Sequence, residues 1–161
     1  APFTKRLGFA VFDNAELLYF AVKTFKLPRT GASIRAEVSQ SMKNLIREFK
    51  PRLVLLKTLN SRQIKSENLT YAFSQVKCEA KFRKLPIKEI SFEKVKRELC
   101  ATDKATKAVL FKRLSAVYPE LKLLASFQNS SQAEYYNSLF SAVAIGFYWQ
   151  NQVRKSKQTP V

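Results

Sequence analysis

The sequence predicts a single α/β domain in which a mixed sheet is flanked by helices. Segments rich in β-forming residues alternate with segments whose apolar residues recur at helical spacing, and the first two β-type segments adjoin each other. With 161 residues, 46% of them hydrophobic, the chain is long enough for one compact core and short for two. We expect the domain to span residues 1–154 and residues 155–161 to form a basic tail without stable structure.

The chain is predicted to open with an antiparallel hairpin. Residues 7–12 and 17–25 are rich in β-forming and aromatic residues, and the turn-forming segment 13–16 joins them. Asp13 falls in this turn, where aspartate is common because it hydrogen-bonds locally. Gly8, inside the first strand, indicates either a bulge or the close approach of another backbone segment.

A helix is predicted next, with Ser33 as its N-cap and Pro51 closing it. Its apolar positions recur at helical spacing: Ile34, Val38, Met42, Leu45, Ile46 and Phe49.

The stretch 52–59 follows at once and contains four successive apolar residues, which predict a strand buried on both faces. Lys57 ends this apolar run. Open α/β sheets bind their ligands at the carboxyl ends of such strands, which makes Lys57 a candidate functional residue. Alternatively, its stem lies over apolar surface and its ammonium group reaches solvent.

The remaining elements are predicted from the periodicity of apolar residues and from residues that typically begin or end helices. Asn60 and Ser61 are predicted to open one helix with an apolar face, and residues 87–92 to form a short strand. Three further helices are predicted over residues 92–99, 106–118 and about 132–154, with Pro119 ending the second of them. If the β-type segments are wrongly assigned, the chain is instead a basic helical bundle.

The charge of the chain points to a polyanionic partner. Lysine and arginine number 29 against 12 acids, which gives a net charge of +17 and a pI near 10.1. Nucleic acid is the commonest such partner. A membrane surface is disfavoured, because no stretch combines a basic face with a clean apolar face and the longest apolar segment is too short to span a bilayer.

Several chemistries are excluded or disfavoured by composition. Histidine is absent, which removes Ser-His-Asp and Cys-His catalysis and leaves carboxylates as the plausible anchors for a catalytic ion. Cys78 and Cys100 lack metal-binding spacing and are expected to be reduced. The N-terminus does not read as a signal peptide, so an intracellular protein is expected, in the cytoplasm, the nucleoid or an organelle.

Three segments resemble the RuvC-type Holliday-junction resolvases and their YqgF-like relatives, which have the ribonuclease-H-like fold. Residues 4–11 (TKRLGFAV) are similar to the turn and second strand of that family. Residues 90–96 (ISFEKVK) and 103–109 (DKATKAV) are similar to the region after its fifth strand, where basic residues lie beside the nucleic acid. Residues 132–139 (QAEYYNSL) resemble the start of its final helix, which holds two acids three residues apart.

The resemblance implies phosphodiester hydrolysis by two divalent ions, Mg²⁺ or Mn²⁺, held by a cluster of carboxylates. The sequence departs from that cluster. Lys57 occupies the place of a glutamate at the end of a strand, and Asn137 replaces the second acid of the final helix. Glu134 keeps the first acid and is the one candidate metal ligand. The family's first-strand aspartate is expected just ahead of Thr4, where the chain reads Ala-Pro-Phe.

We therefore expect a catalytically degenerate nucleic-acid-binding protein that needs no cofactor, in which Lys57 substitutes for a cation. The partner would be a DNA junction or structured RNA, and the family analogy suggests a homodimer. Two alternatives remain: an active Mg²⁺- or Mn²⁺-dependent, structure-selective endonuclease, and a protein-binding scaffold within a nucleoprotein complex. The polar positions Glu134, Asn137 and Ser141 could also be simply the exposed face of a helix.

Basic residues near the resemblance segments are predicted to contact phosphates, although an ordinary solvated face would look the same. They are Lys5, Arg6, Lys94, Lys96, Arg97, Lys104 and Lys107. Four aromatic residues could stack on bases but are more typical of a core. These are Phe127, Tyr135, Tyr136 and Trp149.

Overall fold

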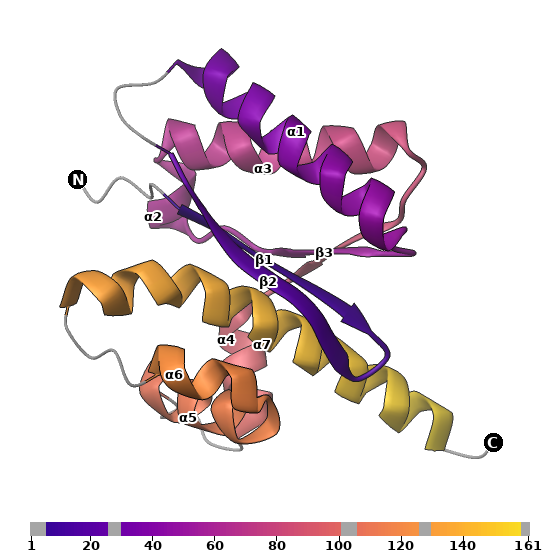
Figure 1. The fold of residues 1–161 in the computed structure, drawn as a ribbon, viewed down its shortest axis with the longest axis vertical. Helices are drawn as coiled ribbons and strands as arrows, with labels where there is room; N and C mark the ends of the chain where they lie inside the picture. The colour runs from indigo at the N-terminus through magenta and orange to yellow at the C-terminus, as the bar shows by residue number, and fades with distance from the viewer. Residues whose placement is uncertain (1–5, 26–29, 101–105, 126–129, 159–161) are drawn as a thin grey trace. The chain divides into compact units, whose positions relative to one another are not determined.

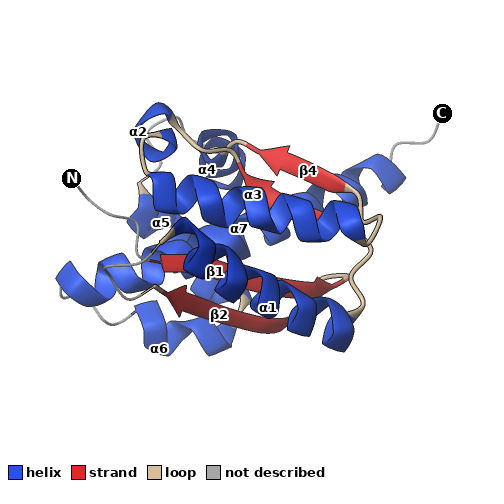
Figure 2. Ribbon diagram, turned by 90° about the horizontal axis from the view of Figure 1, so that it is seen from above, coloured by secondary structure: helices blue, strands red, loops and turns tan. Residues whose placement is uncertain are grey.

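The computed structural model describes residues 6–25, 30–100, 106–125 and 130–158 (Figures 1 and 2). They fall into two compact units. The first unit comprises the described part of residues 1–7 and 23–89, and the second comprises residues 8–22 and the described part of 90–161. The prediction of a single domain over residues 1–154 stays a prediction.

The described elements alternate between strands and helices as predicted, and then become helical. In chain order they are β1 (Arg6–Asp13), β2 (Glu16–Thr24), α1 (Gly31–Phe49), β3 (Val54–Lys57), α2 (Ser61–Ile64), α3 (Glu67–Phe82), β4 (Ile87–Ile90), α4 (Phe92–Cys100), α5 (Lys107–Val117), the 3₁₀ turn η1 (Pro119–Leu121), α6 (Lys122–Ala125) and α7 (Ser130–Gln158).

The predicted hairpin is confirmed. Strands β1 and β2 pair, and two residues, Asn14 and Ala15, connect them. Asn14 has a positive φ of 49°, which asparagine tolerates better than most residues. Its side-chain Nδ2 donates to Asp13 Oδ1 at 3.1 Å, so Asp13 makes the local hydrogen bond expected of a turn aspartate.

The N-cap of helix α1 lies three residues earlier than predicted. The cap is Thr30, whose side-chain oxygen accepts a hydrogen bond from the Ser33 backbone N–H at 3.3 Å. The assignment of Ser33 as the cap was wrong, because two hydroxyl residues compete within one turn and the backbone turns helical after the first. The helix ends at Lys50, which adopts the left-handed conformation ahead of Pro51.

The helix predicted to start at Asn60 is two helices. Asn60 caps the short helix α2 through a capping box, in which its side chain accepts from the Gln63 N–H and the Gln63 side chain accepts from the Asn60 N–H. The chain then becomes extended at Ser66, and α3 starts afresh at Glu67. The predicted apolar face of α3 is largely confirmed, since Leu69, Ala72, Val76 and Ala80 are buried.

Within the first unit, α1 packs against α3, and a buried carboxylate of α3 accepts a hydrogen bond from α1. Glu79 of α3 is 7% exposed. It accepts hydrogen bonds from Ser39 Oγ of α1 at 2.5 Å and from Gln75 Nε2 of its own helix at 3.2 Å. Because a buried polar group stabilises a fold when it is hydrogen-bonded, this contact fixes how the two helices lie against each other.

Strands β3 and β4 form the second pair of strands. The Val54 N–H donates to the Pro86 carbonyl at 2.9 Å, which joins the segments leading into both strands. The described strands thus form two small pairs instead of one continuous sheet. The prediction that β3 is buried on both faces was wrong: Leu56 is buried, whereas Val54 and Leu55 are half-buried.

The second unit is built on α7, which packs against α4 and α5. Pro119 ends α5 as predicted, but it also opens η1 and then α6, which the sequence analysis did not anticipate. Helix α7 continues to Gln158, so residues 155–158 of the predicted basic tail are helical; residues 159–161 lie outside the described residues. Lys155 and Lys157 in the last turn are favourable near a helix C-terminus, which explains the extension.

Two glycines let the hairpin approach α7 closely. A Cβ atom on Gly8 of β1 would overlap the backbone carbonyl of Ser138, and a Cβ atom on Gly146 would overlap the ring of Phe12. The close backbone approach that was one of the two readings of Gly8 is therefore observed.

Tyr118 packs in the aromatic core between the hairpin, α5 and α7. Its ring lies edge-on to Phe12 and to Phe147, with centroid distances of 5.9 and 5.8 Å. Its hydroxyl donates to the carbonyl of Ala15 at 3.2 Å, so the one polar atom of the ring has a partner.

Stability at alkaline pH is expected to depend on Tyr118. Burial raises the pKa of this phenol, Arg154 lowers it by its positive charge and Glu120 raises it, and the net direction is upward. A folded-state pKa above the unfolded value gives stability that is fully present below about pH 10 and is lost as pH rises through the folded pKa. Tyr118→Phe should therefore be about 1 kcal/mol less stable near pH 7, through loss of the hydrogen bond, yet lose less stability above about pH 10. Urea unfolding of both proteins at the two pH values measures this difference; an identical alkaline loss in the variant would contradict it.

Candidate functional site

Lys57 is the last residue of β3, as the sequence predicted. It is half-buried and directly follows the buried Leu56. The side chain thus leaves the carboxyl end of a strand that is anchored in the core of the first unit. The stretch that follows carries Asn60, whose capping box fixes where the chain turns into α2.

The candidate residues of the final helix lie in the first half of α7, in the second unit. Asn137 is half-buried, and its backbone carbonyl accepts a hydrogen bond from Ser141 Oγ at 2.7 Å. Ser141 therefore satisfies its hydroxyl within the helix. Glu134 belongs to α7, but its side chain lies outside the described residues.

Neither Lys57 nor Asn137, each taken by itself, supplies the negative charge that a ligand of a two-metal centre brings. A lysine ammonium repels a divalent cation, and an asparagine amide brings no negative charge to neutralise one. Across the described ranges, no group of three or more Asp, Glu, Cys or His side chains is placed to hold a metal ion.

The predicted phosphate-binding cations of α4 are partly neutralised by acids of the same helix. Lys96 Nζ lies 2.6 Å from Glu93 Oε2, and its side chain is only 19% exposed. Lys94 Nζ lies 3.9 Å from Glu98 Oε1, and Glu98 also accepts from Gln152 of α7. Two of the cations that were predicted to contact phosphates therefore each have an acid of the same helix as a partner, and the side chain of Lys96 is largely covered.

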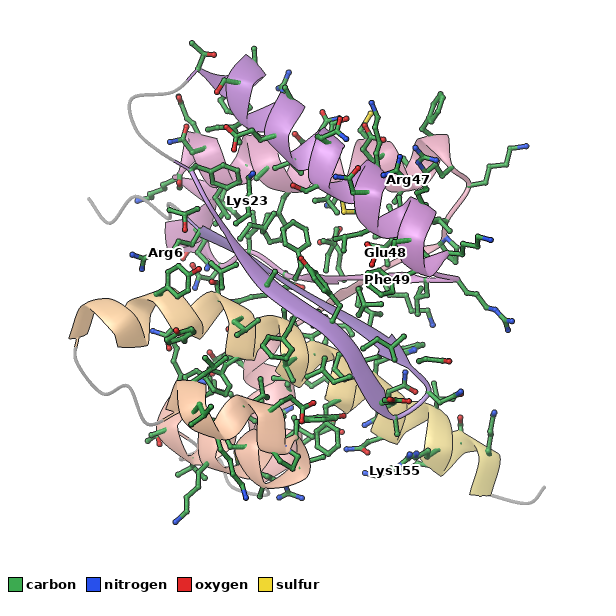
Figure 3. All side chains as sticks on the ribbon, in the orientation of Figure 1. Arg6, Lys23, Arg47, Glu48, Phe49 and Lys155 are labelled. Carbon is green, nitrogen blue, oxygen red and sulfur yellow. The ribbon has the colours of Figure 1, made fainter. Side chains whose placement is uncertain are left out.

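The other predicted binding residues are scattered. Arg97 of α4 and Lys107, the first residue of α5, are exposed. Arg6 begins β1 and is half-buried (Figure 3). Lys5 and Lys104 lie outside the described residues.

The candidate stacking aromatics are not freely presented. Tyr135 and Tyr136 lie edge to face with centroids 5.0 Å apart, and both are half-buried, as is Trp149. Phe127 lies outside the described residues. The most exposed aromatic side chain that the structure reports is Phe82 at the end of α3, at 83%. Sequence reasoning missed it, although Phe82 follows Ala80 by two residues, about 200° around the helix, and so lies off the apolar face of α3.

Comparisons with known proteins identify the architecture. Neither a protein-family model nor a curated protein matches the sequence. Among solved structures, Thermus thermophilus RuvC matches with a TM-score of 0.70 and 16% identity, over 98% of this chain and 95% of that chain. The T. thermophilus RuvC in complex with a Holliday junction substrate matches with a TM-score of 0.73 and 17% identity, over 97% and 92% of the two chains.

No helix in the described ranges combines the length and apolar character needed to cross a membrane.

The predicted fold class is confirmed by the structural match over nearly the whole chain. The chain has the ribonuclease-H-like fold of the RuvC Holliday-junction resolvases.

Proposed function

We propose that this chain is a RuvC-like nucleic-acid-binding protein that has lost metal-dependent cleavage. The proposal rests on Lys57, a lysine at the carboxyl end of β3, where the resemblance to the resolvases implies a glutamate. Fold alone does not specify activity, so the proposal depends on this residue and on Asn137.

The electrostatics of Lys57 favour phosphate over metal. Replacing a carboxylate by an ammonium changes the local charge by two units, from attracting a cation to attracting an anion. A lysine ammonium can contact a phosphate directly through charge-assisted hydrogen bonds. The site therefore supports binding of a nucleic-acid backbone without hydrolysis.

The partner that fits this proposal is branched DNA or structured RNA. The net charge of +17 supports a polyanion, and the similar RuvC structure was solved on a Holliday junction substrate. Phosphate contacts do not distinguish the two nucleic acids. A homodimer and an intracellular location remain parts of the proposal that come from analogy and from the sequence.

The test is a pair of assays on one preparation. We expect salt-sensitive binding to a four-way junction or structured RNA, and no cleavage of either in Mg²⁺ or Mn²⁺. Arg97→Gln and Lys107→Gln, the exposed cations of α4 and α5, should each weaken binding and lower the salt slope by about 0.9 for a duplex substrate. Metal-dependent cleavage by the unaltered protein would overturn the proposal in favour of an active endonuclease. Binding to no nucleic acid at low salt would leave the scaffold alternative.

A further inference from the structure

A dense cluster of exposed positive charge in the first unit lies where α1 and α3 end. Helices α1 and α3 pack side by side and run in the same direction, so their C-terminal ends lie together (Figures 1 and 2). We call this surface the cationic end. It consists of the exposed side chains of Arg47, Lys50, Arg52, Lys81, Arg83 and Lys84, with Phe82 among them.

Backbone hydrogen bonds define where the two helices end. The Val54–Pro86 hydrogen bond joins the segments that leave the two helices. Lys50 and Lys84 both have positive φ, of 45° and 55°, and their N–H groups donate to carbonyls of the preceding helical turns. The chain therefore takes the left-handed conformation common at helix C-termini at two lysines, and both turns present basic residues.

Acids do not neutralise the cationic end. Glu48 is the one acid within residues 47–52, and residues 81–84 contain none. Glu89 of the adjoining strand is paired with Lys77, at 2.6 Å. One or two cations would be enough to interact favourably with the dipoles at two helix C-termini. Six cations are therefore more than the stability of these helices requires. Figure 3 labels Arg47 and Glu48 at this end of α1.

The cationic end also carries an exposed aromatic side chain, that of Phe82. Its ring is 83% exposed, and it sits between Lys81 and Arg83 in the sequence. A large exposed aromatic ring flanked by cations matches the combination by which proteins hold unpaired strands: cations contact the phosphates, and a ring stacks on a base.

We propose that the cationic end binds a single-stranded segment of nucleic acid, with an unstacked base on Phe82 and the adjacent phosphates on Arg83, Lys84 and Lys50. This surface differs from the site of the proposed function. It lies where β3 begins, whereas Lys57 lies where β3 ends. A protein carrying both surfaces would hold a branched or folded substrate at one and a flexible strand of it at the other.

The first experiment isolates the stacking contact. Phe82→Leu keeps an apolar side chain and removes the ring, and the high exposure of Phe82 makes unfolding of the variant unexpected. Affinity is measured for single-stranded oligonucleotides of about 12 nucleotides, as DNA and as RNA, each with normal bases and with abasic residues. We expect Phe82→Leu to weaken binding about 5-fold or more on normal bases and not on abasic ones. Equal affinities of the variant and the unaltered protein on normal bases would overturn the proposal.

The second experiment isolates the phosphate contacts. Arg83→Gln with Lys84→Gln should lower the salt slope for single strands by about 1.4, two phosphates at about 0.7 each. The matched control is Lys122→Gln with Lys157→Gln, two exposed cations of the second unit that change the net charge equally. A slope equal to that of the control would overturn the proposal while leaving the junction-binding proposal untouched. The DNA and RNA arms tell which strand is preferred.

Discussion

Gly8→Ala is expected to destabilise the protein by about 3 kcal/mol, at the upper end of what overpacking costs. The added methyl group would overlap the Ser138 carbonyl and lie 2.7 Å from the backbone nitrogen of Leu139. Backbone atoms inside a helix cannot rotate away, so β1 must separate from α7, where Leu139 and Phe140 are 2% and 1% exposed. Unfolding in urea followed by the fluorescence of Trp149, the single tryptophan, reports on this unit. The midpoint of thermal unfolding should fall by about 6 to 12 °C.

Gly31→Ala is the matched control for this variant. Its added methyl group would meet the ring of Tyr71, with the nearest carbon at 2.6 Å, and a side chain can move where a backbone cannot. Gly31 is also the first residue of α1, where alanine favours the helix. We expect a change within about 1 kcal/mol. Similar small effects of both substitutions would show that the contact of β1 with α7 is not rigid.

The sequence predicted an element well wherever its apolar residues followed a single periodicity. The i, i+4 spacing of Ile34, Val38 and Met42 identified α1, and these three residues are buried as a helical face requires. Boundaries depended on choices among similar neighbours. Thr30 and Ser33 are both competent caps, and only the backbone geometry decides which one the helix uses.

Burial of β3 could not be predicted from composition. Its apolar run has the composition of a strand covered on both faces, yet among the described residues the strand pairs with β4 alone. Burial depends on which strands and helices surround a segment, and this is tertiary information that a local window lacks.

The neutralised cations of α4, in contrast, could have been recognised. Glu93 and Lys96 are three residues apart, and Lys94 and Glu98 are four apart, the spacings at which helical side chains meet. The exposure of Phe82 could have been recognised in the same way. Two residues after Ala80, it lies about 200° around the helix from the buried face of α3.

Lys57→Glu is expected to weaken binding to a four-way junction or structured RNA about tenfold at low salt, and to lower the salt slope by about 1. The substitution removes a cation and adds an anion where the proposal places a phosphate. Lys57→Arg keeps the charge and should stay within about twofold of the unaltered protein. Lys157→Glu makes the same change of net charge on the last turn of α7 and should have a clearly smaller effect. Fluorescence anisotropy across a salt series measures all four proteins.

The Lys57→Glu variant also distinguishes a protein that has lost nuclease activity from one in which Lys57 has no functional role. Lys57→Glu restores one carboxylate, but Asn137 still supplies none, so we expect no cleavage in Mg²⁺ or Mn²⁺. Adding Asn137→Asp places an acid three residues after Glu134 in the sequence of α7, and metal-dependent cleavage by this double variant would identify the substitutions as the cause of inactivity. If Lys57→Glu binds as tightly as the unaltered protein, Lys57 makes no phosphate contact. The lysine then only extends from a strand end to solvent, and the proposed function loses the residue that carries it.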